Sequence, residues 1–175
     1  DSCEAKEGLV NELTIKKQIA AKCQQFESND IYKLMMNMPS DIFCAFDGNF
    51  YITDTGNNRI VAVDGEFSKA VEVYDKFTFS DGRETTLKKP SGVFVSAENQ
   101  LMYIADTENS RVLITNLTGN AVGEITKPDT EIYGSQRTFN PQRVIADKAG
   151  NVYVVLNNIT TGAAMFSPNG EFMGF

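Results

Sequence analysis

The chain has 175 residues, of which 42% are hydrophobic and 22% are charged, as in a globular protein of one domain or two small ones. No apolar run approaches the roughly 18 residues that cross a bilayer, so a transmembrane span within this chain is excluded. The absence of histidine excludes His-built zinc sites and Ser-His-Asp triads. Sixteen basic against 23 acidic residues give a net charge of −7, which opposes capture of nucleic acid or anionic lipid.

Residues 1–38 form an N-terminal segment with its own pattern. Leu9, Leu13, Ile15 and Ile19 approximate helical spacing and predict a helix at about residues 8–25, with outer strands of a sheet as the competing interpretation. The apolar stretch 31–36 predicts an outermost strand. Because the chain starts at an aspartate without a charged and apolar leader, we expect a removed signal peptide or a trimmed start.

The three cysteines show no metal-ligand spacing. Cys44 stands in the apolar run 42–46 and is predicted to be a small buried side chain. Cys3 and Cys23 can form a disulfide if the segment around them folds back and brings their Cα atoms within bridging distance.

An internal repeat runs through the rest of the chain. Pro39, Pro90 and Pro141 are spaced by 51 residues, and a tyrosine follows each proline by 12 or 13 positions. The segments Tyr-Ile-Thr-Asp-Thr-Gly-Asn-Asn-Arg-Ile (51–60) and Tyr-Ile-Ala-Asp-Thr-Glu-Asn-Ser-Arg-Val (103–112) then align closely. The third copy keeps Tyr153 and two valines before it diverges. Such a period is the signature of a repeat architecture.

Each repeat unit reads as four short strands separated by turn residues, because alternating or β-branched apolar runs recur within it. Four antiparallel strands per repeat of 40–50 residues are typical of a β-propeller blade. A single sandwich of about a dozen strands is the alternative, but it gives no reason for a repeat in register. The strands are expected at 42–46, 50–53, 60–63, 70–74, 92–95, 102–105, 111–115, 121–125, 143–146, 152–156, 163–166 and 171–175.

The stretch from Pro39 to Ile60 resembles the NHL repeat, and residues 90–112 and 141–155 resemble further copies, the last with a weakened second half. The resemblance covers residues 39–175 and implies an all-β propeller with blades at 39–89, 90–140 and 141–175. Propellers of this family commonly have six blades. The family includes RNA binders, lyases, partner-binding scaffolds and bacterial envelope proteins, so it implies fold more strongly than function.

Polar residues repeat between the second and third strands of the first two units. They invite two interpretations: a structural turn network, in which Asp and Asn accept backbone N–H groups, or a ligand-binding rim. In the third unit Leu156 and Thr161 replace the aspartate and the arginine, so that turn must be held otherwise or pack against apolar groups. The six candidate rim residues are Asp54, Asn57, Arg59, Asp106, Asn109 and Arg111.

Two other sets of residues carry expectations. The repeated tyrosines are predicted to bury their rings between adjacent blades, where each hydroxyl needs a hydrogen-bonding partner. The connections 75–89 and 126–140 are long and polar, and they suit either a binding role or packing against the blades.

Three blades do not close a ring, because propellers take four to eight and an open arc leaves apolar faces and strand edges in water. Either the natural protein is longer, or two chains form a homodimer that completes six blades.

The leading functional hypothesis is a non-catalytic module that binds a protein or a glycan, without a cofactor and outside the cytoplasm. The runner-up is a hydrolase or lyase that uses a divalent metal such as Ca²⁺, held by Asp41, Asp54, Asp106 and Asn157 if their loops share one channel mouth. RNA binding is disfavoured, because the only compact basic cluster is Arg83, Lys88 and Lys89.

Overall fold

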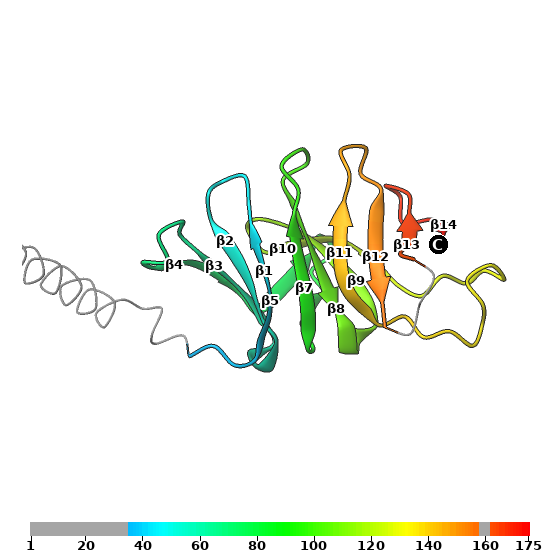
Figure 1. The fold of residues 1–175 in the computed structure, drawn as a ribbon, viewed down its shortest axis with the longest axis horizontal. Helices are drawn as coiled ribbons and strands as arrows, with labels where there is room; N and C mark the ends of the chain where they lie inside the picture. Colours follow the sequence, from blue (N-terminus) through cyan, green and yellow to red (C-terminus); the bar gives the residue numbers. More distant parts are fainter. Residues whose placement is uncertain (1–34, 158–161) are drawn as a thin grey trace, which may run out of the picture.

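The computed structural model describes residues 35–157 and 162–175, and Figure 1 shows them as three sheets standing side by side. The predicted helix at 8–25, the Cys3–Cys23 pair and most of the predicted strand 31–36 lie outside the described residues. Residues 35–37 have no regular secondary structure. Within the described part of the chain, no helix combines the length and apolar character that crossing a membrane requires.

The first and third sheets are four-stranded antiparallel meanders, in which each strand pairs with the next one along the chain. In the first sheet short turns connect the strands, so that consecutive strands can pair directly. The first sheet contains β1 (Pro39–Cys44), β2 (Phe50–Asp54), β3 (Arg59–Val63) and β4 (Ala70–Tyr74). The third contains β11 (Pro141–Ala146), β12 (Val152–Leu156), β13 (Ala164–Phe166) and β14 (Phe172–Gly174).

The middle sheet has six strands in the order β6-β5-β10-β9-β8-β7. The connection 75–89 is not a loop throughout, because it contains the hairpin of β5 (Lys76–Phe79) and β6 (Glu84–Thr86). β5 pairs in parallel with β10, so the hairpin extends the outer edge of this sheet. The remaining strands are β7 (Pro90–Val95), β8 (Leu101–Asp106), β9 (Arg111–Asn116) and β10 (Asn120–Ile125).

All twelve predicted strands are present, and their ends differ from the predicted ranges by a few residues. Gly48 and Gly170 turn with φ of +79°, as their Asp-Gly and Asn-Gly dipeptides indicate. The structure consists of three sheets, each built on four antiparallel strands that follow one another in the chain. This arrangement confirms the predicted all-β propeller fold with three blades in this chain.

Each repeated proline opens the first strand of its blade. A register shift follows it in all three blades, between Pro39 and Asp41, and at the matching positions of the second and third blades. Proline has no N–H to donate to a ladder, so it is tolerated at the first residue of a strand or at a bulge. The 51-residue spacing of the prolines therefore records the spacing of the blade starts.

The blades pack face to face. We call the side of a blade that is turned toward the next blade in the chain its forward face, and the opposite side its rear face. Because side chains alternate along a strand, each blade presents one set to each neighbour. Tyr51, Ile60 and Tyr74 of the first forward face form one buried cluster with Val93 and Ile104 of the second rear face.

A second buried cluster joins the second and third blades. Tyr103 and Val112 of the second forward face pack with Val144 and Val154 of the third rear face. The connection 126–140 contributes to this core, since Tyr133 is fully buried and Phe139 is 2% exposed. Likewise Phe77 and Leu87 of the connection 75–89 belong to the first cluster. The apolar residues of both connections therefore pack against the blades.

The repeated tyrosines occupy equivalent places. Tyr51 and Tyr103 are 2% and 3% exposed, whereas Tyr153, on the forward face of the third blade, is half-buried. The hydroxyls have the expected partners: Tyr51 and Tyr153 donate to Asp47 and Asp147 at 3.1 Å, and Tyr103 accepts from the Asn99 side chain at 3.1 Å. Burial, with the nearby Tyr74 and Asp47, raises the pKa of Tyr51 well above its ordinary value.

The prediction that Cys44 is buried is wrong. Its side chain is exposed, although Val95, the corresponding residue of the second blade, is 3% exposed. The difference arises from position, because Val95 lies between two blades whereas Cys44 lies on the rear face of the first blade, where no described blade covers it.

Replacing Tyr103 with alanine removes a ring from the second cluster and is expected to lower the free energy of unfolding by roughly 3–5 kcal/mol. Urea unfolding measures the loss, with Val122→Ala as the control because Val122 is 56% exposed. Equal stability of the two variants would contradict the position of Tyr103 between blades.

Candidate functional site

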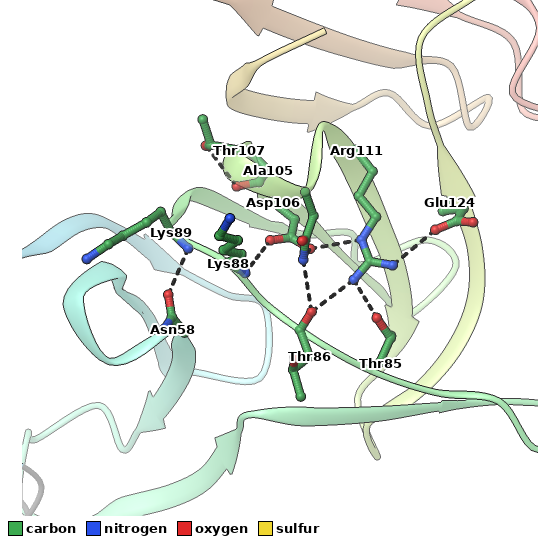
Figure 2. Close-up of polar contacts among 11 residues, drawn as sticks. Asn58, Thr85, Thr86, Lys88, Lys89, Ala105, Asp106, Thr107, Arg111 and Glu124 are labelled. Carbon is green, nitrogen blue, oxygen red and sulfur yellow. Dashed lines mark hydrogen bonds and ion pairs between the residues drawn. The ribbon is translucent and has the colours of Figure 1, made fainter.

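The repeated polar residues form a clamp at the start of each of the first two blades. In the second blade, Asp106 ends β8 and is completely buried. One carboxylate oxygen accepts the backbone N–H of Lys88 at 2.7 Å, two residues before Pro90. The other accepts from Asn109 and from Arg111 Nε, both at 2.8 Å. Figure 2 shows the carboxylate between Lys88 and Arg111. Asp106 therefore ties the start of the first strand of its blade to the turn between the second and third strands.

The Arg111 guanidinium extends this network to the outer hairpin. It donates to Glu124 at 3.1 Å, to the hydroxyl of Thr85 at 2.7 Å and to the backbone carbonyl of Thr86 at 3.0 Å (Figure 2). The side chain is only 10% exposed and joins β9 to β10 and β6. Arginine suits this role because its planar fork directs several donors in fixed directions.

The first blade repeats the clamp. Buried Asp54 accepts the backbone N–H of Asn37 at 2.7 Å, the Asn57 amide at 2.8 Å and Arg59 Nε at 2.7 Å. In both blades the connecting turn is a short 3-10 helix, η1 (Thr55–Asn57) or η2 (Thr107–Asn109), which ends at a residue in the left-handed region, Asn58 or Ser110. The equivalent residues thus make equivalent contacts.

A threonine next to each clamp links its blade to the following one. Thr55 donates to the carbonyl of Pro90 at 2.7 Å, and Thr107 donates to the carbonyl of Pro141 at 2.6 Å. Ser40 and Ser91 add a parallel step, donating to the carbonyls of Ser91 and Gln142. The aspartates therefore act within a blade and the hydroxyls between blades.

The third blade has an apolar substitute for the clamp. Leu156, at the aspartate position, is 3% exposed and belongs to the second cluster, which also contains Phe139. Phe139 stands 51 residues after Lys88, the residue whose N–H Asp106 holds. The alternative of an apolar contact in this turn is therefore the one observed, while Thr161 lies outside the described residues.

All six candidate rim residues belong to the two clamps, in which they bond to one another. The two aspartates have no exposed surface, and both carboxylate oxygens of each accept hydrogen bonds from residues of their own clamp. Of the four residues considered for a calcium site, Asp54 and Asp106 are fully buried and bonded within their own clamps, and Asp41 lies 3.8 Å from Arg143. Among the described residues, no group of three or more Cys, Asp and Glu side chains is placed to hold a metal ion.

A polar cluster outside the repeated Asp-Thr-x-Asn-x-Arg motif lies where the first strands of the three blades meet. Asp41, Gly92 and Arg143 occupy the same repeat position. Arg143 crosses all three strands, donating to the carbonyls of Ser91 at 2.5 Å and Ser40 at 3.1 Å. Gly92 leaves room for this, because a Cβ there would lie 2.7 Å from the Gln142 carbonyl. In the sequence, this cluster is marked by the residues that stand two positions after each repeated proline, namely an aspartate, a glycine and an arginine.

A cleft of about 300 Å³ lies between the second and third blades. Its apolar wall includes Leu101, Val122 and Pro168, and polar groups come from the turn residues Asn99 and Asn169. Amides beside apolar side chains can orient a ligand while the apolar wall excludes water. Unlike the buried clamps, this cleft has exposed residues at its edge, since Asn99, Val122 and Asn169 are all exposed.

Comparisons with known proteins agree on the fold. No protein-family model matches the chain. A stretch of 97 residues is 30% identical to part of Protein SUPPRESSOR OF QUENCHING 1, chloroplastic, of Arabidopsis thaliana. Similar solved structures are hydrazine synthase of Kuenenia stuttgartiensis (TM-score 0.58, 13% identity, 80% of this chain) and the extracellular domain of a putative one-component system from B. thetaiotaomicron (0.54, 14%, 78%). The nidogen/laminin complex is similar with a TM-score of 0.51, 17% identity and 78% coverage.

The chain spans only a part of these proteins. The match covers 53% of this chain but 9% of the curated relative, and the structural matches cover 36%, 18% and 46% of the three solved chains. At these identities the structures are similar in their β-propeller fold alone.

Replacing Asp106 with asparagine places an amide donor beside Arg111 Nε and the Asn109 amide, and removes the buried carboxylate of the pair, so that Arg111 keeps only the partly exposed Glu124 as a charge partner. Breaking such a pair is expected to cost about 3–5 kcal/mol of the free energy of unfolding. Chemical denaturation at neutral pH measures it. The matched control is Glu98→Gln, since Glu98 makes only an exposed ion pair with Lys148 at 3.6 Å, worth about 1 kcal/mol or less. A loss no greater than the control's would contradict a structural role for the clamp.

Proposed function

We propose that this chain is part of a non-catalytic, NHL-type propeller module that binds a protein or a glycan partner outside the cytoplasm. The observation that carries the proposal is the cleft between the second and third blades, whose apolar wall meets exposed amides from two different turns. A rigid scaffold that presents turn residues around a preformed cleft is a common arrangement for binding sites.

The division of polar residues supports this interpretation. The repeated Asp, Asn and Arg side chains are engaged in holding turns, so we assign them to the scaffold that supports the cleft. Glu124 connects the clamp of the second blade to the cleft, because it contacts Arg111 and also lines the cleft. Through this contact the clamp fixes the position of β10 at the cleft wall.

The proposed location rests on proteins of the same fold. One is by name the extracellular domain of a putative one-component system, and another is the nidogen/laminin complex. The curated relative is by name chloroplastic, so fractionation of cells that produce the full protein is the relevant test of location. Recovery in the cytosolic fraction would contradict this part of the proposal.

Val122→Arg places a long charged side chain in the cleft, and binding is expected to fall by about tenfold or more, equivalent to about 1.4 kcal/mol. The probes are an array of immobilised glycans and an array of synthetic peptides, with titration of the strongest hit by each variant. Val71→Arg is the matched control, because Val71 lies 51 residues earlier on β4 and is 48% exposed, but does not line the cleft. No binding to either array, or equal binding by both variants, would overturn the proposal.

A further inference from the structure

Each end of the three-blade arc presents a blade face that does not contact another blade of the described residues. Figure 1 shows the first and third sheets at opposite ends of the arc, so the rear face of one and the forward face of the other point away from the middle sheet. In the described part of the chain, no further blade covers either face.

The rear face of the first blade matches the rear face that is buried in the second. On this rear face of the first blade Val61 and Val63 are fully buried, but Pro39 and Ile42 on its first strand are exposed, Ile42 by 53%. Pro90 and Val93, 51 residues later, are buried. A hollow of about 560 Å³ lies on this face and is lined by apolar groups that include Ile42, Ile52 and Phe67. At the two formed interfaces, the tyrosine of the preceding blade packs into the cluster at this position.

The forward face of the third blade shows the same contrast. Val155 is 46% exposed, whereas Ala105, at the same repeat position, is fully buried. Ile145 and Met173 beside it are each 56% exposed, and Tyr153 is half-buried with its hydroxyl already bonded to Asp147. The forward face of the third blade therefore presents a tyrosine and apolar side chains at the positions that, in the first and second blades, cover the rear face of the following blade.

The polar edges also correspond. At each formed interface a threonine hydroxyl donates to the carbonyl of the next blade's proline. Asn157 occupies the threonine position in the third blade, is exposed, and carries a side-chain amide that can donate in the same way. Pro39, exposed on the first blade, is the proline whose carbonyl corresponds to those of Pro90 and Pro141.

We infer that the forward face of the third blade binds the rear face of the first blade of a second copy of this chain. Each copy carries one face of each kind, so two copies related by a two-fold axis make the contact twice and leave neither face open. Three blades from each copy give six, within the range of four to eight at which propellers close. A head-to-tail contact that closes in this way gives a finite dimer rather than a filament.

Analytical ultracentrifugation of the chain tests this inference, using one variant for each face. The wild type is expected at twice the 19.3 kDa chain mass. Ile42→Arg and Val155→Arg each break both contacts of the ring and are expected at the mass of one chain. Both residues are already exposed in the single chain, so the substitutions leave its core intact. Val122→Arg, on neither outer face, is the control and is expected to remain dimeric.

Mixing the two face variants separates this arrangement from other dimers. The intact forward face of Ile42→Arg can bind the intact rear face of Val155→Arg, so the mixture is expected to form a one-to-one complex that neither variant forms alone. A symmetric contact between two forward faces would instead leave Ile42→Arg dimeric by itself. A wild-type chain that stays monomeric at its highest soluble concentration, for example because residues 1–34 or further blades of a longer polypeptide occupy these faces, would overturn the inference.

Because Val122→Arg is expected to lose ligand and keep the dimer, failure of the dimer and failure of the proposed cleft give different results.

Discussion

The packing of one blade's forward face on the next blade's rear face is the contact on which the rest of the structure depends. A four-stranded sheet with two apolar faces is not stable alone in water, and burial of apolar area supplies most of the stabilisation. Both buried clusters lie at such contacts, and even the long connections direct Phe77, Tyr133 and Phe139 into them. The cleft proposed for binding is the outer part of the same contact.

Polar groups hold this packing in register, and the blades use two ways of doing so. The buried carboxylates of Asp54 and Asp106 accept a backbone N–H just before the first strand of their own blade. The hydroxyls of Thr55 and Thr107 donate to the carbonyl of the proline that begins the next blade. The third blade replaces the aspartate with Leu156 in the apolar cluster. Buried ion pairs elsewhere tolerate replacement by well-packed apolar residues, which explains how one blade keeps the fold without the motif.

Much of this architecture could be predicted from the sequence, because the repeat sets both strand positions and side-chain direction. The prolines, the tyrosines and the Asp-Thr-x-Asn-x-Arg turns each indicated a feature that recurs in space. The hairpin β5–β6 could not be predicted from the repeat, since it occurs in one unit only and its parallel pairing with β10 is a tertiary contact. The exposure of Cys44 depends on which blade lacks a neighbour, so the local sequence pattern did not predict it. The role of Arg143 depends on backbone carbonyls of two other blades, so the local pattern did not predict that role either.

A crystal structure of the chain gives the most direct test of this face-to-face packing. The account predicts that Tyr51 and Tyr103 are each covered by the following blade, and that Tyr153 is covered in the same way by Ile42 and Ile52 of a second copy. Tyrosine rings in three unrelated surroundings, or a Tyr153 ring facing solvent in every copy, would contradict it.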